Sequence, residues 1–68
     1  MTTEIISVPE IHCGHCKTSI EGALQPLEGV EHAAVDVDAR TVEVAFDERQ
    51  VDRARLVAAI EEQGYEVP

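Results

Sequence analysis

The sequence is poor in several of the features that anchor or stabilise a small protein. It has two cysteines, no tryptophan, one tyrosine, one phenylalanine and 5 basic side chains against 14 acidic ones in 68 residues. The net charge of −9 opposes binding to nucleic-acid phosphates and to anionic membrane surfaces. No apolar stretch approaches the ~20 residues of a membrane span, and the N-terminal segment lacks a positively charged signal region. We therefore expect a soluble cytoplasmic protein that binds no nucleic acid and inserts into no membrane.

The length predicts a single domain, residues 1–68. A chain of this size buries only about 60% of the surface that its unfolded state exposes, so a disulfide or a metal often supports the fold. The two cysteines, Cys13 and Cys16, are three positions apart, and a disulfide between them would close a loop too short to constrain the unfolded chain. A reducing cytoplasm would also keep them as thiols. We therefore expect the two cysteines to have a functional role rather than to stabilise the fold as a disulfide.

The hydrophobic pattern predicts six elements. Four segments have the β-branched or alternating apolar residues of strands: 4–8, 30–37, 40–46 and 65–67. Two other segments repeat apolar residues at helical spacing. The first helix starts near Cys16 and ends around Pro26, and the second is capped by Asp52 and ended by Gly64. The order βαββαβ predicts an α+β protein with a ferredoxin-like fold, in which two helices cover one face of a four-stranded antiparallel sheet.

The segment PEIHCGHC, residues 9–16, holds both cysteines and two of the three histidines. Cys13 and Cys16 straddle the predicted transition from loop to helix, where both side chains can converge on one ion. The partial positive charge of a helix start stabilises thiolate over thiol and lowers the cysteine pKa. Two thiolates without an obligatory third ligand suit Cu(I), whereas structural Zn(II) normally takes four ligands. The spacing therefore predicts a Cu(I) site.

Two alternatives stay open from the residues alone. Cys-Gly-His-Cys is also the active-site tetrapeptide of protein disulfide isomerases, which would make the chain a thiol-disulfide oxidoreductase. Against this, Ile11 and His12 precede the motif where those enzymes have an aromatic residue, and the predicted strand order is not that of a thioredoxin fold. The second alternative is a carrier of Zn(II) or another divalent ion. We expect a metal carrier and not an enzyme.

Over its whole length the chain resembles heavy-metal-associated domains, specifically bacterial copper chaperones. The resemblance rests on four stretches: IHCGHC, GVEHAAVDV, TVEVAFD and LVAAIEEQGYEV. It implies that Cys13 and Cys16 bind Cu(I) and that Tyr65 lies beside the site. It also implies transfer of the ion by thiolate ligand exchange to the metal-binding domain of a copper-transporting P-type ATPase, or to a copper-responsive regulator. The protein is then a monomer or a copper-bridged dimer.

Two positions depart from the pattern of that family. Residue 11 is Ile where the family has Met, and residue 10 is Glu where Gly is common. The family's Met packs into the core under the metal loop, and Ile has a similar volume, so Ile11 is expected to keep that anchoring role. Glu10 is expected to be a solvated loop residue. Both changes therefore concern the loop rather than the thiolates.

The other polar residues near the motif have less specific roles. His15, between the cysteines, is either an accessory ligand or an exposed spacer, and Tyr65 either shields the metal or forms part of the core edge. His12 and His32 are expected to face solvent. Lys17, in the first helical turn, either offsets the negative charge of a bis-thiolate complex or is simply solvated.

Overall fold

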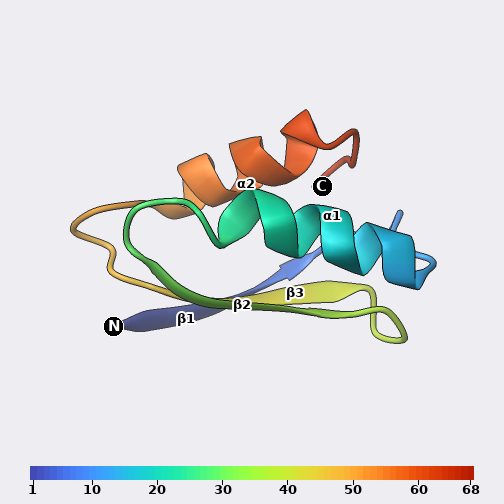
Figure 1. Cartoon of the computed structure of the whole chain (residues 1–68), viewed down its shortest axis with the longest axis horizontal. Coiled ribbons are helices and arrows are strands. Elements are labelled where there is room, and N and C mark those ends of the chain that lie inside the picture. The colour runs from blue at the N-terminus through green and yellow to red at the C-terminus, as the bar shows by residue number, and fades with distance from the viewer.

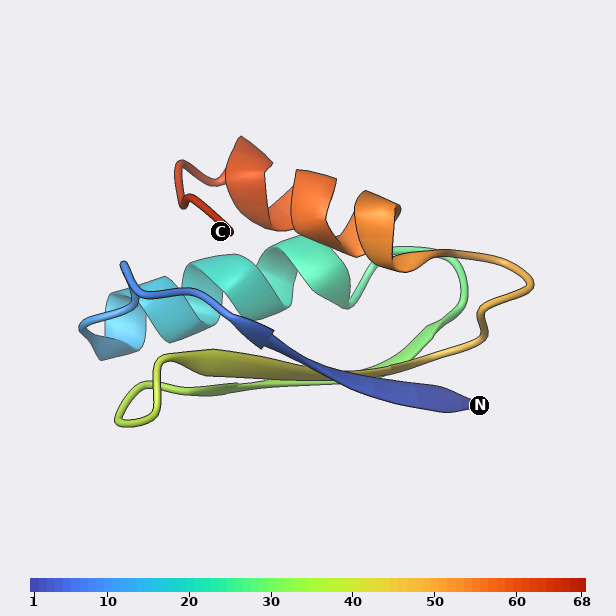
Figure 2. The same ribbon diagram turned by 180° about the vertical axis from the view of Figure 1, so that it is seen from behind.

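The computed structural model describes residues 1–68 and has two layers, a sheet and a pair of helices (Figure 1). Its elements are β1 (Thr2–Ser7), α1 (Gly14–Leu24), β2 (Val30–Asp36), β3 (Thr41–Phe46) and α2 (Arg53–Glu62). The sheet order is β1-β3-β2, and both neighbouring pairs are antiparallel. The opposite views of Figures 1 and 2 show both helices on the same side of the sheet. The α+β prediction with two helices on one face is therefore confirmed.

The core lies between the helices and one face of the sheet because the strands alternate as predicted. Ile6 of β1 is fully buried, while its neighbour Ile5 points to the open face and is 63% exposed. The inward residues of β2 and β3 and the apolar stripes of both helices complete the core. They are Ala33, Val35, Val42, Val44, Phe46, Ile20, Leu24, Leu56, Ala59 and Ile60.

The predicted fourth strand at residues 65–67 is wrong, so the sheet has three strands and not four. No backbone–backbone hydrogen bond involves residues 65–68. The backbone N–H of Glu66 donates instead to the side-chain carboxylate of Glu10. A strand requires a ladder of backbone bonds, and here a side chain takes the donor that would begin one. The segment after α2 consequently lies against the loop that precedes α1.

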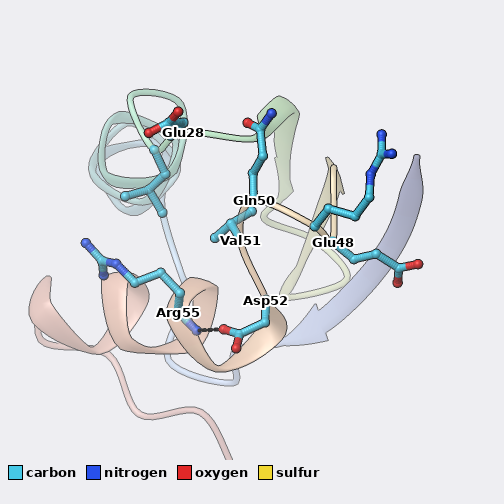
Figure 3. Close-up of a pocket in the computed structure, with 8 residues that line it drawn as sticks. Glu28, Glu48, Gln50, Val51, Asp52 and Arg55 are labelled. Atoms are coloured by element: carbon cyan, nitrogen blue, oxygen red, sulfur yellow. Dashed lines mark hydrogen bonds between the residues drawn. The ribbon is translucent and has the colours of Figure 1, made fainter.

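The helix ends follow local sequence signals. The Asp52 carboxylate accepts the Arg55 backbone N–H at 2.9 Å, which is the predicted N-cap of α2 (Figure 3). Gly64, just after α2, has a positive φ of 94° that favours glycine. The first helix begins at Gly14, two residues before the predicted start, with Cys13 as its N-cap residue. Neither helix is long and apolar enough to cross a bilayer.

The loop between β1 and α1 is held from two directions. The Val8 N–H donates to the Arg40 carbonyl at 2.9 Å, which ties the loop to the β2–β3 turn, and the Ile11 N–H donates to the Val8 carbonyl at 3.1 Å. Ile11 itself is fully buried. The expected burial of Ile11 is therefore confirmed, and its anchoring role stays a prediction.

Candidate metal centre

The two cysteines lie together at the N-terminus of α1. Their Sγ atoms are 3.7 Å apart, and both cysteines are free thiols. Cys13 is half-buried and its side chain makes no capping hydrogen bond, whereas Cys16 belongs to the first turn of the helix and is only 3% exposed. The pair thus combines one buried sulfur in the first turn of the helix with one half-buried sulfur at the N-cap position.

The surroundings of Cys16 favour its thiolate. Its pKa is lowered from 9.0 to about 7, first because the Tyr65 hydroxyl donates to its sulfur and next because the His12 backbone N–H does so. Burial acts in the opposite direction, and the Cys13 thiol and N–H add further donors. Because metals bind the thiolate, these donors prepare Cys16 for a metal at neutral pH.

Tyr65 reaches the site from the segment that follows α2. It is half-buried, and its pKa is raised chiefly because its hydroxyl donates to the Cys16 sulfur. The hydrogen bond between Glu10 and the Glu66 N–H ties this segment to the metal loop. Glu10 is exposed, but its carboxylate is engaged and not merely solvated as expected. The contact between Tyr65 and Cys16 therefore joins the C-terminal segment to the predicted site.

Of the three histidines, His12 and not His15 lies against the cysteines. The Nδ1 atom of His12 is 3.9 Å from Cys16 Sγ and 2.8 Å from the Glu10 carbonyl oxygen. Ligand atoms of His12, Cys13 and Cys16 all lie within 4.8 Å of one another. His12 is exposed, as expected, but its ring nitrogen also lies beside the thiols, which the sequence analysis did not predict. Helical spacing could not have found it, because His12 precedes the N-cap residue Cys13 and lies outside the helix.

The remaining polar residues of the motif region lie outside this cluster. His15 is exposed at the start of α1 and takes no part in the group of three ligand atoms. Lys17 is exposed in the same turn, and His32 is exposed on β2, as expected for a surface residue. The structure thus brings together Cys13, Cys16 and Tyr65 as predicted and adds His12.

A second concave surface lies at the end of the molecule away from the cysteines, between the C-terminal side of α1 and the start of α2 (Figures 1 and 3). This cavity of about 400 Å³ is lined by carboxylates, arginines, an amide and two apolar side chains. It has no thiol or imidazole among its lining residues. A soft metal ion would find its preferred ligands only at the cysteine end.

The chain is similar to known proteins over nearly its whole length. The family described as heavy-metal-associated domain matches residues 5–66. A copper chaperone named CopZ from Staphylococcus haemolyticus is 42% identical over 67 residues, which cover 98% of each chain. Among solved structures, a CopZ metallochaperone has a TM-score of 0.95 and 39% identity, with 98% of this chain and 100% of that chain covered. A copper binding domain from HMA7, a P-type ATPase, has a TM-score of 0.94 and 29% identity, with 100% and 92% covered.

Proposed function

This chain belongs to the heavy-metal-associated domain family, and we propose that it is a cytoplasmic chaperone that carries Cu(I) between Cys13 and Cys16. Its similarity to copper chaperones over nearly the full length supports a carrier of copper rather than an enzyme. In this proposal the ion is the cargo, and the protein passes it to a partner that has a similar pair of thiolates.

One observation carries the proposal: two free thiols, one half-buried and one buried, lie 3.7 Å apart at the start of α1, with donors arranged around the buried one. Thiolate bonds to a first-row metal of about 2.3 Å would place the sulfurs of a linear complex about 4.6 Å apart. The pair would have to open by about 0.9 Å, from the observed 3.7 Å, to bind Cu(I) in a linear geometry. Cys13 lies in the loop without a capping bond, so rotation of its side chain supplies this movement while Cys16 stays in place.

The different burial of the two cysteines suggests an order of exchange. A thiolate of the partner approaches the ion on the exposed side and forms a three-coordinate intermediate. Cys13 leaves first because it is half-exposed, and its sulfur then takes a proton from water. Cys16 leaves last because it is buried in the helix and its thiolate is stabilised by Tyr65. The ion is never released to the solvent.

We propose the metal-binding domain of a copper-transporting P-type ATPase as the partner, with a copper-responsive regulator as the other candidate. The similarity of this chain to a copper binding domain from a P-type ATPase supports the first choice, because two copies of one fold present their thiolate pairs in the same way. Such an exchange needs only a monomer, although a copper-bridged dimer would use the same two sulfurs.

Disulfide exchange by the Cys-Gly-His-Cys motif is the competing reading. A thiol with a pKa of about 7 suits that chemistry as well as metal binding. The three-stranded sheet and the family of the chain favour the carrier. A turnover assay separates the two, because an oxidoreductase reduces or isomerises disulfides faster than a free dithiol does and a carrier does not.

The test of the proposal is copper transfer under anaerobic conditions. We expect Cys13→Ser and Cys16→Ser each to lose high-affinity Cu(I) binding while keeping the fold, and the control Thr18→Ala, an exposed residue in the same helix, to bind as the wild type does. The loaded protein is then mixed with an acceptor domain and a chelator that traps only released copper. Copper should reach the acceptor directly. If the chelator intercepts it in proportion to its concentration and the acceptor gains none, the protein is a copper buffer and not a chaperone.

A further inference from the structure

The cluster at the start of α1 contains more donors than a linear Cu(I) complex uses. Two thiolate bonds of about 2.3 Å that span the observed 3.7 Å enclose an angle of about 107°, which is close to tetrahedral and far from linear. In its metal-free form the pair is therefore already shaped for an ion with a higher coordination number. The question is which further ligand completes the site.

His12 is placed to be that ligand. Its Nδ1 atom is 3.9 Å from Cys16 Sγ, and the ligand atoms of His12, Cys13 and Cys16 all lie within 4.8 Å of one another. A single ion bound to all three needs only small movements of side chains that lie in a loop and at the first turn of a helix. His15, although it is located between the cysteines in the sequence, lies outside the cluster.

The loop holds the His12 ring in this position. The buried Ile11 fixes the backbone just before it, and the Glu10 carbonyl oxygen, 2.8 Å from Nδ1, accepts a hydrogen bond from the Nδ1–H group. On binding a metal, Nδ1 would exchange this hydrogen bond for a bond to the ion. The proton on Nδ1 passes to water when this nitrogen binds the ion.

We infer that Cys13, Cys16 and His12 form a three-donor site for Zn(II), as a second cargo besides Cu(I). Zn(II) takes thiolate and imidazole ligands in tetrahedral sites, and two sulfurs and one nitrogen leave the fourth position open to water or to a partner's thiolate. Cu(I) is satisfied by the two thiolates alone. The inference rests on the proposed function because it uses the same cysteines, and it adds His12 as the residue that sets the choice of metal.

The experiment compares His12→Ala with the matched control His15→Ala, which removes an imidazole three residues away but outside the cluster. Zn(II) and Cu(I) affinities of the anaerobic, reduced proteins are measured by competition with chelators. Co(II) then serves as a spectroscopic probe, since its visible absorption bands report the number and type of ligands. We expect His12→Ala to lower Zn(II) affinity tenfold or more, to change the Co(II) bands and to leave Cu(I) affinity within threefold. His15→Ala should change none of these.

A loss of Zn(II) affinity of less than tenfold in His12→Ala, or an equal loss in His15→Ala, would overturn the inference. His12 is exposed, so its replacement is compatible with folding, and circular dichroism checks this. The Cu(I) measurements on the cysteine variants are independent of this outcome. If Cys13→Ser kept its Cu(I) affinity, the chaperone proposal would fail whatever the Zn(II) result, whereas an unchanged Zn(II) affinity in His12→Ala refutes only the three-donor site.

Discussion

Truncation of Ile11 is the most demanding test of how the core supports the metal loop. The side chain is fully buried beneath the loop that presents His12 and Cys13. Replacement of a buried Ile by Ala removes its burial and leaves a cavity, with a cost of about 2–4 kcal/mol. A domain of this length is stable by roughly 3–10 kcal/mol in total, so Ile11→Ala should lose a large part of the free energy of unfolding.

Urea unfolding of the metal-free protein, followed by circular dichroism, measures this loss. With a denaturant dependence of about 1 kcal/mol per molar urea, as small domains have, the midpoint should fall by roughly 2–4 M. The melting temperature should fall by about 4–8 °C for each kcal/mol. Ile11→Ala could remove nearly all of the stability and leave the protein unfolded. Ile11→Val, with an expected cost of about 0.5–1.5 kcal/mol, therefore provides a milder second variant.

The control is Ile5→Ala, which makes the same truncation on the open face of the sheet, where the side chain is 63% exposed. It should change stability by less than about 0.5 kcal/mol, the usual range for surface substitutions. Ile11→Met, which restores the residue common in the family, should cost less than about 1.5 kcal/mol because it nearly conserves volume. If Ile11→Ala lost no more than Ile5→Ala, Ile11 would not anchor the loop and the reasoning from its burial would be wrong.

Further predictions concern the thiolate and the second helix. The ionisation of Cys16, followed across pH by the NMR chemical shift of its β-carbon, should have its midpoint near pH 7. Tyr65→Phe should move this midpoint towards 9.0 because the hydrogen bond from the hydroxyl is lost, and an unmoved midpoint would exclude that hydrogen bond. The folded pKa of Cys16 is lower than its unfolded value of 9.0, so its thiolate contributes fully to stability above pH 9, and the contribution is lost as pH falls through 7. Stability of the reduced protein should therefore rise from pH 7 to 9 more in the wild type than in Cys16→Ser, and parallel profiles would contradict this linkage. Asp52→Ala should lower the free energy of unfolding in urea by about 1 kcal/mol because the hydrogen bond from the Arg55 N–H is lost. Asp52→Ser should keep most of this free energy, because serine also caps helices.

Local patterns in the sequence determined most of the fold. The alternation of apolar residues placed Ile6, Val42, Val44 and Phe46 on the buried face of the sheet, because successive side chains of a strand point to opposite faces. The Asp52 cap and the left-handed Gly64 follow from contacts within a few residues of each other. The Cys13–Cys16 spacing likewise predicted two sulfurs at one helix start, since residues three apart are neighbours on a helix.

Only the tertiary structure decided the features that depend on contacts between residues far apart in the sequence. The strand pattern of residues 65–67 did not become a strand, because the Glu10 carboxylate takes the Glu66 N–H from 56 residues away. The same contact brings the C-terminal segment to the metal loop, where Tyr65 donates to Cys16 and lowers its pKa. The sequence drew attention to His15, which is located between the cysteines, rather than to His12. The direction of the His12 side chain depends on how the backbone of the loop is anchored, which the sequence does not show. Burial of Ile11 and the Glu10 carbonyl turn His12 towards the thiols, and only the folded chain brings these groups together.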